Sequence, residues 1–432
     1  MIRNLCLALA MAAALGIASA RTASAADSPP PPGTEITPGN WQQYKAFMPL
    51  GMQYLFAGKY FWKLPADAKI VVSPTTHYEL PQVYLDNTRK YADTVKIITL
   101  SDGGHAISGY VAGQPFPNPS DPMKGYKILV DLWYRYIPYL FCGNEDHEIL
   151  ENSEGQRSDF RVVQAWRRLS HISDVGEPIN DPRAQGIDYS EYVMFTEPEQ
   201  FKYTEILTLY YTDYSRQEDE FLFVPQLRRV IRQSSNSRCA PLNNGDFTPD
   251  DLTGFNGGIT RFQADYLADQ SVLSLIDSPP KIFGDEANYY LPMFFPKPSL
   301  GKWEVRDSYV VDIRRIPSQH AGYCYGKAVT YVDKYSFNAS WKDMYDDNMH
   351  LSKIDMTEKI AAPVQNAGVQ YSNGNSIETM WDINRNHLSS FFTAQPGGIG
   401  MVNGAACRNV DGVNYDDIQA YSTVGGLTQI MR

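Results

Sequence analysis

From Phe201 onward, the apolar residues of this chain recur at every second position, which is the period of a β-strand with one buried face. In residues 203–211, apolar side chains share one side of such a strand and threonines occupy the other. The alternation returns after short turns in 221–224 and 227–232. Short strands joined by tight turns predict an antiparallel meander.

The clearest strand is residues 303–314, because its two sides differ sharply in polarity. One side carries Trp303, Val305, Tyr309, Val311 and Ile313, with Asp307 among them. The other side carries Glu304, Arg306, Ser308, Asp312 and Arg314 beside Val310. A shift of one residue would exchange the two sides, so we expect a well-defined register with the charged side away from the core.

Further strands are expected in 325–332, in 335–337 after a turn at residues 333–334, and in 377–392, which has room for one or two. Residues 159–169 fit a helix or a strand.

Three segments nearer the start of the chain have the period of an amphipathic helix. The first spans 41–55 and should be kinked or split at Pro49. The second spans 81–91, with proline in its first turn, where it is well placed. The third begins with an Asp-Pro pair at 121–122 that can cap and open it, and Pro138 stops it.

The first residues indicate a secretory signal peptide. Arg3 precedes a short apolar run, and small residues follow at 23–26. We therefore expect a soluble periplasmic protein. The predicted divisions of the chain are a signal peptide at 1–26, a proline-rich leader at 27–36, and a single domain at 37–432, with helices and first strands in 37–140 and an antiparallel meander in 141–432.

The charge balance argues against nucleic acid as a partner. The 38 basic residues include Arg3 and Arg21, so cleavage leaves 36 against 49 acidic residues and a net charge of −13. Such a chain has no electrostatic attraction to nucleic acid or to anionic lipid surfaces. An outer-membrane barrel is not expected either, because the second sides of the strands carry charges and the chain has no aromatic end strand.

The predicted mature chain retains four cysteines, Cys142, Cys239, Cys324 and Cys407. An even number in an oxidising compartment favours two disulfides, and three pairings are possible. No two of them have the close spacing of a zinc knuckle or a redox motif.

Motifs for catalysis are missing from the sequence. Around His147, the acidic stretch 145–151 lacks the second histidine of a zinc-protease motif, so we interpret it as an acidic loop. No Gly-x-Ser-x-Gly elbow is present, and the glycines at 398–404 have the wrong spacing for a nucleotide loop. His105 and His320 have no obvious partners. We predict no catalytic residue, no metal and no cofactor.

Four ordered motifs carry a family resemblance. Residues 111–119, V-A-G-Q-P-F-P-N-P, precede an aromatic helix, and F-V-P-Q-L-R-R-V-I-R follows at 223–232. The segments D-D-L-T-G-F-N-G-G-I-T-R at 250–261 and Y-G-K-A-V-T-Y-V-D at 325–333 complete the set. Together they resemble domain-of-unknown-function family 1329, over roughly residues 40 to 390.

This resemblance implies a fold like that of the periplasmic lipoprotein carriers (LolA and LolB). The expected class is mainly β (α+β), with a large curved antiparallel sheet that forms an incomplete β-barrel plugged by a few helices. The family's association with efflux-type transporters and outer-membrane partners suggests the handling of hydrophobic cargo. The family offers no catalytic residues to carry over.

The favoured function is a periplasmic carrier or binding protein for a hydrophobic, lipid-like ligand, working with an envelope transporter. An apolar cavity would bind such a ligand by removing apolar surface from water. The candidate ligand-binding residues are Trp133, Tyr136, Leu209, Tyr211, Phe221, Phe223, Trp303 and Tyr309.

Two alternatives remain open at the level of sequence. One is a structural adaptor that bridges a transporter and the outer membrane, which requires a large exposed apolar patch. The other is an uncharacterised periplasmic enzyme, which requires His147, His105 or His320 close to a carboxylate in a cleft.

Overall fold

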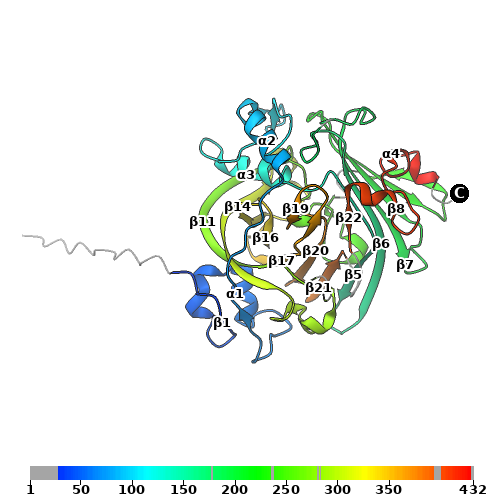
Figure 1. The fold of residues 1–432 in the computed structure, drawn as a ribbon. Coiled ribbons are helices and arrows are strands. Elements are labelled where there is room, and N and C mark those ends of the chain that lie inside the picture. Colours follow the sequence, from blue (N-terminus) through cyan, green and yellow to red (C-terminus); the bar gives the residue numbers. More distant parts are fainter. Residues whose placement is uncertain are drawn as a thin grey trace, which may run out of the picture.

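The computed structural model describes residues 28–429, except 177–178, 235–237, 280–281, 283 and 394–399. Antiparallel strands predominate among them (Figure 1). The predicted signal peptide and residues 398–399 of the glycine segment lie outside this range. Within it, every helix is too short or too polar to pass through a lipid bilayer.

The main sheet contains 14 strands in the described part of the chain, each antiparallel to its neighbours. Its strands are β5 (Leu140–Glu151), β6 (Arg157–Arg168), β7 (Ile187–Glu197), β8 (Glu205–Tyr211), β9 (Asp219–Val224), β10 (Arg229–Arg232), β11 (Phe262–Ile276), β14 (Lys302–Arg315), β15 (Lys327–Asp333), β16 (Ala339–Tyr345), β17 (Leu351–Lys359), β20 (Ser376–Asp382), β21 (His387–Phe392) and β22 (Val402–Asn403). Their order is β10-β9-β8-β7-β6-β5-β21-β20-β17-β16-β15-β14-β11, with β22 beside β5.

The sheet consists of two meanders joined at one seam. Strands β5 to β10 form the first meander. The second consists of β11, β14, β15, β16, β17, β20 and β21, and the seam pairs β5 with β21, with Leu150 opposite Ser389. The edge strands β10 and β11 do not pair with each other in the described residues. The sheet therefore curves without closing into a barrel, which confirms the predicted fold class.

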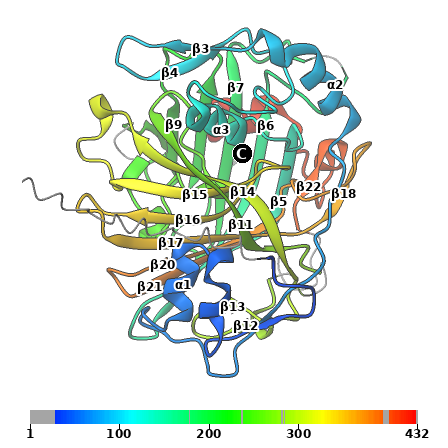
Figure 2. The ribbon, with the colours of Figure 1, turned by 90° about the vertical axis from the view of Figure 1, so that its left-hand side faces the viewer.

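Short elements cover both ends of the sheet. The helices are α1 (Leu50–Phe56), α2 (Gln82–Tyr91), α3 (Lys124–Trp133) and α4 (Ile418–Tyr421), with 3-10 turns at Trp41–Phe47, Ala92–Thr94, Leu242–Asn244, Leu252–Gly254, Glu286–Asn288, Pro317–Gln319, Gly404–Arg408 and Gly426–Thr428. The small strands are β1 (Glu35–Ile36), β2 (Ile70–Val71), β3 (Lys96–Thr99), β4 (His105–Ser108), β12 (Tyr289–Tyr290), β13 (Phe295–Pro296), β18 (Ala362–Val364) and β19 (Gly368–Gln370). Helices α2 and α3 lie at one end and α1 at the opposite end (Figures 1 and 2).

Several local predictions are confirmed. The first helical segment is split at Pro49, because the 3-10 turn ends at Phe47 and α1 begins at Leu50. Helix α2 occupies the predicted 81–91 segment. The ambiguous segment 159–169 falls in strand β6, and 377–392 supplies two strands.

Two predicted element boundaries are wrong. Asp121 does not cap α3, because Met123 occupies the N-cap in a left-handed conformation with φ of 63°, and the helix ends at Trp133. Residues 335–337 form a turn rather than a strand. Asp333 Oδ1 accepts hydrogen bonds from the amides of Tyr335 and Ser336, which holds the chain in the turn until β16 begins.

The charged side of β14 is buried, contrary to the prediction. Glu304 has no exposed surface and Arg306 is 2 % exposed. The guanidinium of Arg306 donates to Asp333 Oδ2 at 2.8 Å, and Glu304 Oε2 accepts from the amide of Thr76 at 3.0 Å. Because other parts of the chain cover both faces of the sheet, these charges are paired inside the protein instead of facing water.

Two helices pack closely on the second meander. A Cβ atom on Gly125 of α3 would lie 2.3 Å from the carbonyl oxygen of Ala264 in β11, so glycine permits the close approach of this helix to the sheet. At the other end, the amide of Gly51 in α1 donates to Asp343 Oδ1 of β16 at 3.0 Å.

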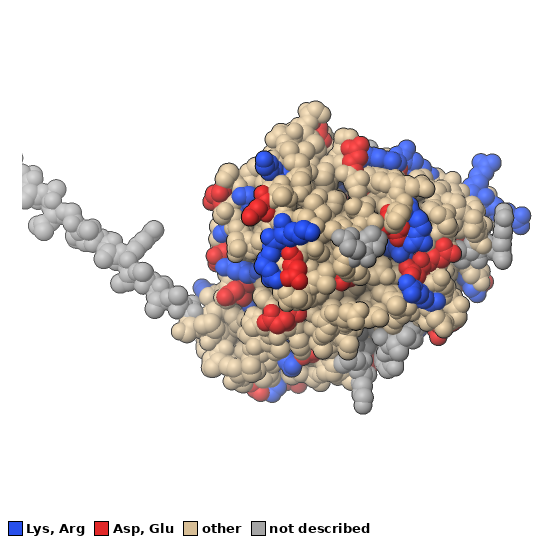
Figure 3. All heavy atoms as spheres, turned by 45° about the horizontal axis from the view of Figure 1, so that its top comes forward, with Lys and Arg blue, Asp and Glu red and all other residues tan. Residues whose placement is uncertain are grey.

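The surface carries both signs of charge. On the face shown in Figure 3, acidic and basic side chains lie interspersed among uncharged ones. Such mixing on this face gives no large field of one sign that would attract a polyanion.

Candidate ligand-binding cavity

A segment of residues 238–262, which we call the plug, lies against the inner face of the curved sheet. It contacts both meanders. The side-chain amide of Asn256 donates to Glu191 Oε2 of β7 at 3.1 Å, and the amide of Thr253 donates to Glu378 Oε2 of β20 at 3.0 Å. A cavity remains between the plug and the strands that it spans.

Strands β6, β7 and β8 form most of one wall. Because successive side chains of a strand point to opposite faces, alternate residues reach the cavity. These are Val162, Gln164, Trp166, Val193, Phe195, Ile206 and Thr208. The plug contributes Leu242, Phe247 and Leu252, and Phe141, Phe391 and Met401 add further apolar surface.

The cavity is mainly apolar and narrow. Its volume is about 100 Å³. Apolar walls with few polar groups are typical of sites for small hydrophobic molecules. An extended ligand would enter only if side chains or the plug moved.

Four carboxyl side chains also line the cavity, Glu148, Glu191, Glu220 and Glu378. Asn243 of the plug donates to Glu148 Oε2 at 2.7 Å. In contrast, Glu191 Oε1 is buried without a hydrogen-bond partner. Leaving such an oxygen unsatisfied costs about 1–3 kcal/mol.

Burial changes the protonation of these carboxyls. It raises the pKa of Glu148 and of Glu191 to about 8, and that of Glu378 to about 7. The cause in each case is the removal of the charged form from water. In an empty cavity at neutral pH, Glu148 and Glu191 are therefore mostly neutral acids.

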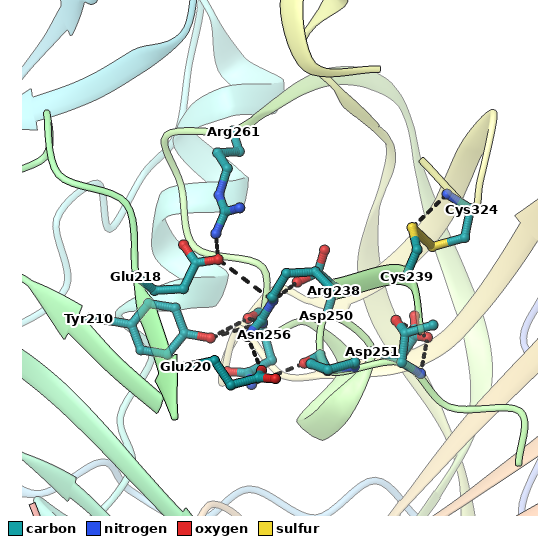
Figure 4. A network of polar contacts seen from close by, with 12 residues as sticks. Tyr210, Glu218, Glu220, Arg238, Cys239, Asp250, Asp251, Asn256, Arg261 and Cys324 are labelled. Carbon is teal, nitrogen blue, oxygen red and sulfur yellow. Dashed lines mark hydrogen bonds and ion pairs between the residues drawn. A yellow bond between two sulfur atoms is a disulfide. The ribbon is translucent and has the colours of Figure 1, made fainter. Parts of the chain in front are cut away.

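A network of ion pairs and hydrogen bonds joins the plug to β8 and β9 beside the cavity (Figure 4). The Arg238 guanidinium donates to Asp250 Oδ1 at 2.6 Å and to Tyr210 Oη at 2.9 Å. Asp250 Oδ2 accepts from Arg315 at 3.0 Å. Arg238 and Arg315 line a surface pocket, whereas Glu220, 3.8 Å from Arg238, lines the cavity.

Two disulfides hold the segments around the cavity. Cys239–Cys324 joins the plug to the chain just before β15, and Cys142–Cys407 joins β5 to the C-terminal segment. The prediction of two disulfides is confirmed, and the structure selects one of the three pairings.

Comparison with models of protein families identifies the family of this chain. The family described as "Protein of unknown function (DUF1329)" matches residues 35–405. The chain belongs to this family. The family resemblance that the sequence motifs predicted is therefore confirmed over most of the sequence.

Solved structures of other proteins share parts of this DUF1329 chain's arrangement. A DUF1329 family protein from Desulfovibrio piger is 13 % identical, with 71 % of this chain and 100 % of that chain covered and a TM-score of 0.47. A LolA superfamily protein from Nitrosomonas europaea is 14 % identical, with 64 % and 93 % covered and a TM-score of 0.37. The comparison with curated proteins gave no match.

None of the eight predicted ligand-binding residues lines the cavity of this DUF1329 protein. Leu209 and Phe223 are buried on the opposite face of the sheet, where they pack with Cys407 and Leu427 of the C-terminal segment. Tyr211 and Phe221 pack partly against the same cluster. A role for these residues in ligand contact stays a prediction.

The other four predicted residues are spread over the molecule. Trp133 packs edge-on against Tyr210 between α3 and the sheet. Tyr136 is buried beside α2, and Trp303 lies in the core that α1 covers. Tyr309 is half-buried, next to Lys124 and Lys334. The structure therefore does not bring the eight residues together.

The interpretation of residues 145–151 as an acidic loop is wrong. They belong to strand β5, and Asp146, His147 and Glu148 are all buried. The alternation of the strand sends Glu148 into the cavity, while His147 stacks on Phe392 on the other face. Burial lowers the pKa of His147 to about 4.

The three histidines considered for catalysis lie apart from the cavity. His147 Nδ1 has no hydrogen-bond partner in the part of the chain that the structure describes, His105 packs against Tyr126, and His320 Nε2 lies 3.4 Å from Asp347 Oδ1 on the surface. None of the three lines the cavity.

Sequence reasoning missed a histidine–carboxylate pair at the plug. His387 Nδ1 lies 2.6 Å from Asp246 Oδ2 of the plug. The hydroxyl of Ser389 donates to the same carboxylate at 2.7 Å rather than to the imidazole. This arrangement fastens the plug to β21 and does not activate a serine nucleophile.

Proposed function

We propose that this protein binds and carries a hydrophobic, lipid-like molecule in the periplasm. The observation that carries the proposal is the enclosed cavity, into which β6, β7 and β8 direct apolar side chains. Apolar ligand surface removed from water contributes roughly 25 cal/mol per Å² to binding.

The disulfides support the proposed compartment. Structural disulfides persist in oxidising environments such as the periplasm, and the sequence begins with the pattern of an export signal. A carrier in this compartment would accept its ligand from one membrane component and deliver it to another.

Native mass spectrometry of the purified protein tests the proposal. We expect a co-purifying apolar molecule, or stoichiometric uptake of added dodecanol. Val193 and Met194 are neighbours in β7 on opposite faces, and only Val193 lines the cavity. Val193→Trp should weaken dodecanol binding about tenfold or more, whereas Met194→Trp should leave it nearly unchanged.

The proposal fails if the wild-type protein neither retains an apolar molecule nor takes up dodecanol. It also fails if the two tryptophan variants weaken binding equally, because binding would then not depend on the cavity.

An adaptor role in contact with a transporter is the second candidate. Strand β10 pairs with β9 and is an edge of the described sheet, and Ile231 on it is 40 % exposed. A free strand edge can accept a strand from a partner protein. Pull-down from envelope extracts should then capture a partner with the wild-type protein and lose it with Ile231→Glu.

A further inference from the structure

The cavity has a one-sided charge. Its four ionisable lining residues in the described chain are all glutamates, one each from β5, β7, β9 and β20, and no lysine, arginine or histidine lines it. A ligand with an anionic head group would therefore meet only glutamates, either ionised and repulsive or protonated and neutral, among apolar side chains. A positively charged group would meet carboxyls alone.

Three cations lie near the cavity without lining it: Arg238, whose charge reaches Glu191, and Lys342 and Lys359, whose charges reach Glu378. Arg238 lies 3.8 Å from Glu220 but contacts Asp250 at 2.6 Å. Lys342 lies 3.1 Å from Asp251 and 3.3 Å from Asp355. Glu148 and Glu191 are therefore the carboxyls best placed to serve a ligand.

Glu191 presents one oxygen at the cavity that no described residue hydrogen-bonds. The residue is 6 % exposed, and Asn256 satisfies only its Oε2 atom. Its Oε1 atom is buried and has no partner among the described residues. A ligand that places an N–H donor beside this atom would satisfy it.

We propose that the hydrophobic ligand of this cavity carries a protonated amine, which Glu191 binds at its free oxygen while the apolar walls hold the rest of the molecule. This inference rests on the proposed carrier function. It adds the chemical class of the ligand: an amphiphilic cation rather than a fatty acid or an anionic lipid. The raised pKa of Glu191 fits this role, because an arriving cation favours loss of the proton that burial retains.

Binding of three chain-matched probes, dodecylamine, dodecanol and dodecanoate, tests the inference at pH 7 below their micelle concentrations. In the wild-type protein we expect dodecylamine to bind about tenfold tighter than dodecanol, and dodecanoate to bind weakest. Glu191→Gln should remove most of the preference for the amine over dodecanol.

Glu358→Gln is the matched control. Glu358 is also buried and has one oxygen without a partner, but it contacts Tyr289 and does not line the cavity. This variant should keep the full amine preference.

The outcomes separate the two proposals. If no probe binds, the carrier function itself fails. If dodecanol binds but the amine has no advantage, or Glu191→Gln retains that advantage, only the amine proposal is overturned. Should Glu191→Gln not fold, the order of the three probes on the wild-type protein still decides, because tighter binding of dodecanoate contradicts the proposal.

Discussion

The side-chain amide of Asn243 donates a hydrogen bond to Glu148 Oε2 at 2.7 Å, which fastens the plug to the wall of the cavity. The two residues are 95 positions apart in the sequence. Both residues also line the cavity, so a movement of the plug away from this wall would break the contact. The plug is therefore the element whose movement we expect to control access.

Asn243→Ala should loosen the plug. The change leaves a buried carboxyl without its donor, at a cost of about 1–3 kcal/mol, so amides of the plug should exchange faster with solvent. Asn244→Ala is the control. Asn243 and Asn244 both have a positive φ, 52° and 61°, so alanine strains the backbone at either position. Equal hydrogen exchange in the two variants would contradict the role of the Glu148 contact.

Lys342→Met should destabilise the protein strongly. Lys342 is buried between Asp251 and Asp355, and its loss leaves two carboxyls without their cation, at about 3–5 kcal/mol. Lys334→Met removes a half-exposed pair with Asp269 and should cost about 0–1 kcal/mol. Urea unfolding midpoints at pH 7 give the comparison, and similar losses in the two variants would show that burial does not matter here.

Local sequence patterns were enough to predict many elements. The helix break at Pro49 follows from proline chemistry, and the strand at 303–314 follows from alternation over a long segment. The curved, open sheet also followed once the family motifs were recognised. The helix break and the strand depend on residues close together in the chain, so a single sequence is enough to predict them.

The cavity could not be predicted in the same way. Alternation in β8 and β9 showed that Leu209 and Phe223 share a face, but the C-terminal segment covers that face and the plug covers the other. The choice between the two faces depends on segments outside these strands, namely the plug and the distant C-terminal segment. Distant segments also bury Glu148, which Asn243 contacts, and Arg306, which donates to the carbonyl oxygen of Thr76; the charges of both residues suggested exposed positions.

Stability should fall as the pH rises from 5 to 8. Glu148 and Glu191 have pKa values of about 8 when folded, against an ordinary value of 4.5. In this interval the unfolded chain has lost both protons and the folded chain retains them, so rising pH favours unfolding by up to about 1.4 kcal/mol per pH unit for each group. Glu148→Gln and Glu191→Gln should flatten the dependence in urea titrations, whereas Glu154→Gln in an exposed turn should not. An unchanged slope in both cavity variants would show that the two carboxyls are ionised in the folded protein.

The two disulfides should differ in their response to mild reduction. Cys142 and Cys407 have no exposed surface, whereas Cys239 and Cys324 are half-buried. Thiol exchange requires access of the attacking sulfur, so a low concentration of reductant should open Cys239–Cys324 first. Alkylation followed by peptide mass spectrometry should label residues 239 and 324 before 142 and 407.

Reduction of Cys239–Cys324 should also destabilise the protein, because this disulfide closes a span of 85 residues at the plug. Its loss should lower the free energy of unfolding, measured by urea titration, by about 2–4 kcal/mol. Labelling of 142 and 407 first, or mapped peptides with another pairing, would contradict this arrangement of the plug.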